Sequence, residues 1–256
     1  MAISILTRAY KTSELKSLIK YLNSIKEVEK EIVAVCNVKD QDINGINLII
    51  ENSNRFEARI TGIKNSNYEN ILLLDSDQIP EKGLFKELES KKEDMIIVPE
   101  KSLNRNLNSM CLNDWRFRNE QLARQKPSPY VPVVPRFYKR KHLINVALRI
   151  PTSVTKIIDH EDSILYYYVY KKTQNVGFSK KFIFNNDPNL LILMKKAYLY
   201  GKNKKKIGNY EIPDEIKILL GRLNRNTLNI KELGIGSGYM IQTIRGIFYE
   251  LGRILG

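Results

Sequence analysis

Short apolar segments alternate with amphipathic ones along the first hundred residues. Aliphatic runs of strand length occupy residues 3–6, 31–36, 47–50, 71–74 and 95–98. Between them, residues 15–25, 54–65 and 82–91 place apolar side chains three and four positions apart, as helices do. Strands that alternate with helices in this way predict an α/β fold with a Rossmann-like, doubly wound and mainly parallel sheet.

A pair of carboxylates follows the fourth of these strands directly. Asp75 and Asp77 stand two positions apart, after four aliphatic residues. In extended backbone, side chains two positions apart project to the same side, so both can reach one hard cation. The spacing alone is weak evidence, because Asp40 and Asp42 repeat it in a polar stretch. The apolar strand before Asp75 is what favours a metal site there.

Other polar residues are expected at the same edge of the sheet. Ligands of doubly wound sheets bind at the carboxyl ends of the strands. Thr7 and Arg8 end the first strand, and Asp40 follows the second. These residues therefore join Asp75 and Asp77 as candidates for binding a substrate.

The regular alternation ends near residue 100. Residues 104–126 are polar and expected to be partly helical around Trp115, and residues 126–135 hold four prolines, which favour extended backbone. An irregular segment of this kind either shapes an acceptor pocket or connects two layers of the fold.

A second acidic group lies far along the chain. Asp159, Glu161 and Asp162 precede the apolar residues 163–170, which predict a helix or a buried strand. Asp159 as N-cap, with the other two in the first turn, is the structural interpretation. A catalytic carboxylate is the alternative.

The C-terminal part is expected to be helical and basic. A helix that begins beyond Pro188 and ends at Tyr200 is followed by the lysine cluster 202–206 and by two or three helices from residue 213 onward. The last helix carries an apolar stripe that can pack on its own domain, on a second subunit or on a membrane. The lysine cluster favours an anionic membrane surface.

The composition and the uneven charge of the chain indicate an anionic partner. The chain has 256 residues, 43% of them hydrophobic, and a net charge of +14. Residues 1–130 hold 20 basic and 19 acidic side chains, and residues 131–256 hold 22 and 9. A basic half suits nucleic acid, phospholipid headgroups or a phosphorylated substrate.

Cysteine and histidine usage indicates a reducing compartment without structural zinc. Cys36 and Cys111 lack metal-ligand spacing, and His142 and His160 are the only histidines. The N-terminus reads as a strand rather than a signal peptide, and no run reaches the roughly 18 apolar residues of a spanning helix. We expect a cytoplasmic protein, soluble or peripherally attached to the membrane.

These motifs together resemble the family 2 glycosyltransferases with the GT-A fold, over about residues 2–200. The matching segments are Ser4 to Tyr10 for the nucleotide-binding turn, Ala58 to Ile63 and Ile71 to Asp77 for the helix and its Asp-x-Asp (DXD) strand, Pro135 to Tyr138 for the acceptor-side strand, and His160 to Asp162 for the acidic catalytic motif. The resemblance implies an inverting, metal-dependent enzyme.

The resemblance also implies a role for each candidate residue. Asp77, supported by Asp75, would hold Mn²⁺ or Mg²⁺ on the donor diphosphate, and Asp162 would be the base, with Glu161 as the fallback. The residues implied near the donor are Thr7, Arg8, Tyr10, Asp40, Arg59, Asp75 and Ser76. The chain departs from the family at Ile60, where an Asn is frequent, and at Asn185 or Asn186, where many members have a His that can contact the metal.

The resulting expectation is a catalytic domain over residues 1–190, with a nucleotide-sugar half (1–100) and an acceptor half (101–190), followed by a helical extension (191–256). The donor would be a UDP- or GDP-sugar, and the acceptor a glycan or a lipid-linked molecule. One alternative is a non-enzymatic binder of nucleic acid or anionic surfaces. Another is a nucleotidyltransferase, although no Gly-rich, Lys-containing loop follows the first strand. Under the leading hypothesis no nucleic-acid partner is expected.

Overall fold

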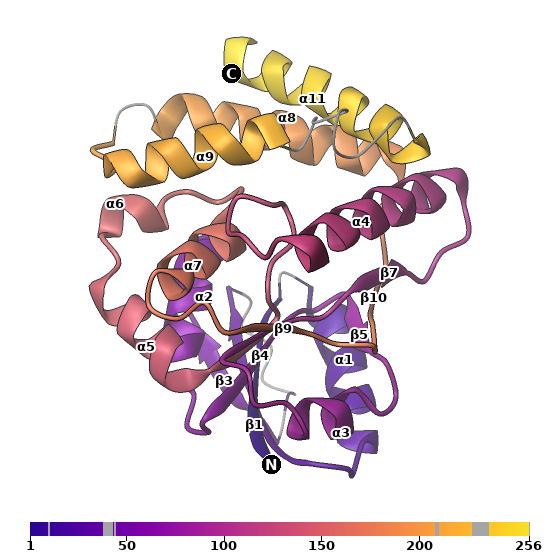
Figure 1. Ribbon diagram of the computed structural model, residues 1–256, viewed down its shortest axis with the longest axis vertical. Helices are drawn as coiled ribbons and strands as arrows, with labels where there is room; N and C mark the ends of the chain where they lie inside the picture. The colour runs from indigo at the N-terminus through magenta and orange to yellow at the C-terminus, as the bar shows by residue number, and fades with distance from the viewer. Residues whose placement is uncertain (10, 38–42, 44, 208–209, 227–235, 256) are drawn as a thin grey trace. The chain divides into compact units, whose positions relative to one another are not determined.

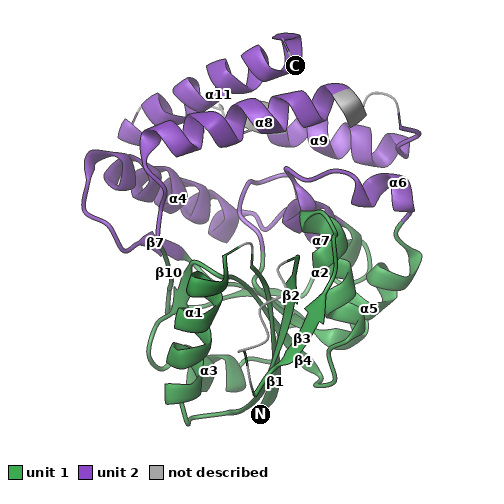
Figure 2. Cartoon of the chain, turned by 180° about the vertical axis from the view of Figure 1, so that it is seen from behind, with its two compact units in different colours: residues 1–99, 135–150, 168–185 green, residues 100–134, 151–167, 186–256 purple. Residues whose placement is uncertain are grey.

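The computed structural model describes residues 1–9, 11–37, 43, 45–207, 210–226 and 236–255. Two compact units make up the chain (Figure 2). Unit 1 consists of residues 1–99, 135–150 and 168–185, and unit 2 of residues 100–134, 151–167 and 186–256. The units are interleaved in sequence, so their limits differ from the contiguous boundaries expected at residues 100 and 190. The assignment of donor and acceptor binding to parts of the chain stays a prediction.

Unit 1 is built on a seven-stranded sheet (Figure 1). Its strands, in spatial order, are β3 (Asn47–Ile50), β2 (Glu29–Cys36), β1 (Ala2–Ala9), β4 (Asn70–Asp75), β8 (Phe137–Lys139), β6 (Met95–Ile97) and β9 (Val176–Phe178). Most neighbours are parallel, and β8 runs antiparallel to both β4 and β6. The predicted doubly wound, mainly parallel sheet is confirmed.

The helices of unit 1 are α1 (Thr12–Ser24), α2 (Arg55–Lys64), α3 (Leu84–Glu89) and α5 (Arg140–Arg149). Leu15, Leu18 and Leu22 of α1 are buried, as their spacing predicts. Residues 71–74 of β4 are fully buried, because a strand covered on both faces has no polar side. Asn54 and Glu57 form a capping box that fixes the start of α2.

A short strand that the sequence did not predict follows the DXD turn (residues 75–77). β5 (Gln78–Pro80) pairs antiparallel with β10 (Ile183–Asn185), and Gln78 stands opposite Asn185. Pro80 ends β5, a position where the missing N–H is tolerated. This strand pair ties the residues after Asp77 to a segment about a hundred positions later.

Unit 2 is mainly helical. It contains β7 (Glu100–Ser102), α4 (Leu107–Gln125), α6 (Thr152–Thr155), the start of α7 (Glu161–Tyr170), α8 (Leu190–Ile207), α9 (Asp214–Asn226) and α11 (Ser237–Leu255). The expected helix end at Tyr200 is wrong, since α8 continues through Gly201 and the following lysines. The structure places α11 against α8 and α4 within this unit.

Glycines allow the close approach of α8 and α11, and Ile241 of the apolar stripe shares a small core with Leu193 of α8. A Cβ on Gly252 would overlap the Tyr198 carbonyl oxygen, and one on Gly201 would overlap that of Tyr249. Of the predicted stripe, Ile241 is buried, whereas Ile247 and Ile254 are more than half exposed. The helix therefore packs inside the unit, as one interpretation proposed, but keeps much of its apolar side outward. Across the described residues, no helix is both long and apolar enough to cross a membrane.

Candidate functional site

The DXD turn leaves the sheet at the carboxyl end of β4. Asp75 is the last residue of that strand and lies beside Arg8 of β1 in the parallel register. Thr7 lies between Leu74 and Ala34 in the same sheet and is buried. The topology thus brings Thr7, Arg8 and Asp75 together at one edge, as expected for a doubly wound fold.

Two arginines of α2 hold the Asp75 carboxylate. Arg55 Nη2 lies 3.2 Å from Oδ2, and Arg59 Nη2 lies 3.2 Å from Oδ1. The Arg59 side chain is 3% exposed, and that of Asp75 is 25% exposed. Burial alone would raise the pKa of Asp75, but Arg55, Arg59, Arg136 and Arg8 together hold this pKa well below its usual range. Asp75 is therefore ionised and anchored on both oxygens.

This anchoring bears on which carboxylate faces a metal ion. Asp75 already accepts from two guanidinium groups, whereas Asp77 lies two positions further on, in the turn and half-buried. The role of Asp77 as the main metal ligand, with Asp75 in support, stays a prediction. Arg59 forms an ion pair with Asp75, and its expected place near the nucleotide stays a prediction.

Gln78 fixes the turn from its other end. Its Oε1 accepts from the Asp75 backbone N–H at 2.9 Å, and its Nε2 donates to Asn185 Oδ1 at 2.7 Å. Gln78 and Asn185 are both buried. Asn185 stands at one of the two positions where the resemblance implies a His, and its side-chain oxygen accepts the hydrogen bond from Gln78. Sequence reasoning missed this link, because nothing local indicates which late residue faces Gln78.

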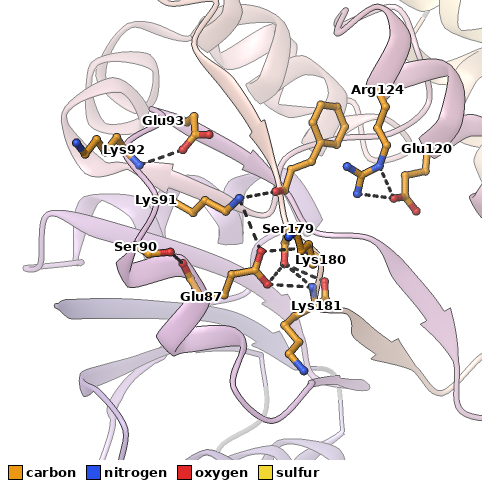
Figure 3. Close-up of polar contacts among 11 residues, drawn as sticks. Glu87, Ser90, Lys91, Lys92, Glu93, Glu120, Arg124, Ser179, Lys180 and Lys181 are labelled. Atoms are coloured by element: carbon orange, nitrogen blue, oxygen red, sulfur yellow. Dashed lines mark hydrogen bonds and ion pairs between the residues drawn. The ribbon is translucent and has the colours of Figure 1, made fainter.

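Two glutamates hold the segment that leads into β10, and Figure 3 shows the contacts of one of them, Glu87. Glu87 accepts from the backbone N–H groups of Lys180 and Lys181 at 2.8 and 3.0 Å and from Ser179 Oγ at 3.1 Å. Burial tends to raise the pKa of Glu87, but these donors and nearby Lys91 lower it overall. Glu81 accepts from Phe182 N at 2.9 Å. Both carboxylates therefore help to position β10 and, through it, Asn185.

The start of α1 lies beside the DXD turn. Ser76 Oγ donates to Glu14 Oε2 at 3.4 Å, and Glu14 pairs with Lys11 at 2.8 Å. The pKa of Lys11 is raised, chiefly by Glu14 and further by Asp77. Ser76 and Asp77 thus face a polar surface on α1. Lys11 and Glu14 were not among the predicted site residues.

Two predicted donor contacts, Tyr10 and Asp40, lie outside the described residues. Thr7 remains a candidate, since its buried hydroxyl has no hydrogen-bond partner among the described residues. A buried hydroxyl of this kind suits a ligand contact.

Glu161 and Asp162 are the first two residues of α7, in unit 2. Glu161 is buried and Asp162 is half-buried. The first helical bond runs from Ile164 N to His160 O, which puts His160, not Asp159, at the position before the helix. Asp77 belongs to unit 1, and a shared cleft between Asp77 and Asp162 stays a prediction.

The oxygen donors suit a sparsely ligated divalent cation. No group of three or more His, Cys, Asp or Glu is placed to hold a metal within the described ranges. Mg²⁺ commonly takes one or two carboxylates and completes its shell with substrate phosphates and water. Asp77 at an anchored turn fits that manner of binding.

Comparisons with known proteins support the fold. No protein-family model and no curated protein matches this chain. Among solved structures, Staphylococcus aureus TarS 1–349 in complex with UDP-GlcNAc is 16% identical, with a TM-score of 0.56 over 97% of this chain and 80% of that one. A mannosyltransferase from Pyrobaculum calidifontis in complex with GDP-Man and Mn²⁺ is 12% identical, with a TM-score of 0.56 over 99% and 82%.

A third structure is glucosyl-3-phosphoglycerate synthase from Mycobacterium tuberculosis, 12% identical, with a TM-score of 0.52 over 87% of this chain and 80% of that one. The chain spans 44% of the longer TarS structure. Identities this low establish a common fold rather than a common substrate. The mostly parallel sheet and its helices therefore form the GT-A fold that these glycosyltransferases share.

Proposed function

We propose that this chain is a glycosyltransferase that moves a sugar from a UDP- or GDP-sugar to a hydroxyl or phosphate acceptor, on a glycan or a lipid-linked molecule. The observation that carries the proposal is the anchored DXD turn at the end of β4 in a GT-A fold. Neighbours of that fold are bound to UDP-GlcNAc and to GDP-Man, which supports a nucleotide-sugar donor.

In the proposed reaction the acceptor oxygen attacks the anomeric carbon and the bond to the diphosphate breaks. Asp162 takes the acceptor proton, with Glu161 as the fallback, and the nucleoside diphosphate leaves with the electron pair. A base held within hydrogen-bond reach typically contributes 10²- to 10⁴-fold in rate. A single displacement of this kind inverts the anomeric centre.

Asp77 would hold Mn²⁺ or Mg²⁺, with Asp75 in support. Such an ion, when bound, stabilises negative charge on the leaving diphosphate. The chain's own contribution is to position Asp77. Arg55, Arg59 and Gln78 hold Asp75, so the adjoining turn is fixed before a donor arrives. Thr7, Arg8 and Ser76 are proposed to contact the donor from the same edge.

The test is a panel of sugar nucleotides, measured by thermal shift and by release of nucleoside diphosphate, with and without Mn²⁺. Asp77→Asn should weaken metal-dependent nucleotide binding. Asp162→Asn should leave binding intact and abolish transfer. Asp214→Asn, an exposed carboxylate on α9 paired with Lys217, is the control and should change neither.

Equal loss of nucleotide binding in Asp77→Asn and Asp162→Asn would refute the division of roles. Salt-sensitive binding of single-stranded nucleic acid, without turnover of any sugar nucleotide, would favour the non-enzymatic alternative instead.

A further inference from the structure

The outer face of α8 combines exposed aliphatic and basic side chains. We define this face as Leu191, Ile192, Lys195, Lys196 and Leu199, which recur at three- and four-residue spacing along one side of the helix. Leu191, Ile192 and Leu199 are 59%, 43% and 57% exposed, and both lysines are exposed as well. The helix holds six lysines and no acidic residue.

The internal contacts of unit 2 use the opposite side of α8. Leu193 packs in a small core with Cys111, Leu112 and Ile241, and Gly201 meets the backbone of α11. Ala197, between Leu193 and Gly201, is buried on the same side. Among the described residues, these buried contacts of α8 lie on the side away from the outer face, and Figure 2 shows α8 running across the front of unit 2 in that view.

We propose that the outer face of α8 docks on an anionic phospholipid bilayer. Aliphatic side chains gain by entering the boundary between headgroups and acyl chains, and neighbouring lysines gain from the negative surface potential. A bilayer uses both features at once.

The other occupants fit this face less well. A second copy of the same face would bring Lys195 and Lys196 against like charges, with no acidic residue of α8 to offset them. Nucleic acid would engage the lysines through its phosphates but would leave Leu191 and Leu199 in water. A lipid surface therefore matches both the charge and the exposed aliphatic side chains of this face.

The experiment is flotation of the full chain with phosphatidylcholine vesicles, with and without phosphatidylglycerol. Binding should require phosphatidylglycerol and weaken with salt. Each lysine near an anionic leaflet contributes about fivefold to partitioning, so Lys195→Glu with Lys196→Glu should lower the partition coefficient at least ~30-fold. Leu191→Ser with Leu199→Ser should lower it about tenfold or more.

Two matched controls separate this face from general charge and general apolar exposure. Lys20→Glu with Lys26→Glu makes the same charge change on exposed residues of unit 1. Ile247→Ser with Ile254→Ser removes similarly exposed aliphatic side chains from α11. Both controls should retain most of the binding, and circular dichroism should show all four variants folded.

Absence of vesicle binding by the native chain would overturn the proposal, as would equal loss in the Lys20/Lys26 control. Light scattering that shows a dimer lost in Leu191→Ser with Leu199→Ser, without vesicle binding, would assign the face to a second copy. Because no sugar nucleotide is needed, failure here is distinct from failure of the proposed function.

Discussion

The same substitution should lower a different property at each of the two carboxylates of the DXD turn. Asp75→Asn removes the negative charge that two guanidinium groups share at 3.2 Å each, one of them on the buried Arg59. Asp77→Asn makes the identical chemical change two residues away. The first substitution should lower stability, and the second should chiefly lower metal-dependent nucleotide binding.

The size of the effect follows from the contacts. Breaking a buried ion pair by removing one partner costs about 3–5 kcal/mol. The Asp75 side chain is a quarter exposed, and an Asn retains one acceptor oxygen, so we expect about 2–3 kcal/mol. For a chain of this size that corresponds to a fall in Tm of roughly 4–12 °C. At Asp77 the loss of stability should stay under about 1 kcal/mol.

Thermal denaturation followed by circular dichroism, without nucleotide or metal, measures the difference directly. Binding of UDP and GDP with Mn²⁺ is then measured on both variants well below their Tm. Equal Tm values for Asp75→Asn and the native chain would show that the arginine pairs do not hold the turn. They would refute the statement that the turn is fixed before a donor binds.

Four further substitutions test other parts of the fold. Gly252→Ala should destabilise the chain by about 1–3 kcal/mol, because the added methyl group meets the Tyr198 carbonyl. Gly246→Ala, in the same helix, adds its methyl group into open space and should raise the stability by up to about 1 kcal/mol. Urea denaturation measures both changes. Glu87→Gln should lower stability at neutral pH by about 1–2 kcal/mol. The folded-state pKa of Glu87 is lowered, so its contribution is present above the ordinary glutamate pKa and lost as pH falls through the folded value; the gap between variant and native chain should therefore close in acid, and an unchanged gap would argue against the assignment. Asn54→Ala should cost about 1 kcal/mol by removing the cap of α2, seen as faster hydrogen exchange in the first turn of that helix.

The centre of the sheet was predictable because its strands β1 and β4 are largely buried. Residues 71–74 are aliphatic without interruption, and a buried parallel strand requires that pattern. The position of Asp75 and Asp77 at a strand end followed directly. The antiparallel position of β8 between β4 and β6 could not be predicted, since a three-residue strand carries too little periodicity to show its direction.

The contacts that shape the candidate site were not predictable from local sequence. Arg59 meets Asp75 because of how α2 lies on the sheet, and Gln78 meets Asn185 across more than a hundred residues. Gly201 was expected near a helix end, because glycine is a common stop signal. In the structure it permits close approach of two backbones instead, a role that depends on a partner helix far along the chain.

The interleaving of the two units has a consequence for synthesis on the ribosome. Every segment of unit 1 has been made once residue 185 is added, so its sheet can close early. Cys111 and Leu112 of α4, in contrast, must wait for Leu193 and Ile241 before their small core is complete. Nascent chains halted between residues 185 and 241 would expose the apolar side chains of Cys111 and Leu112 on α4. Chaperones should bind such intermediates.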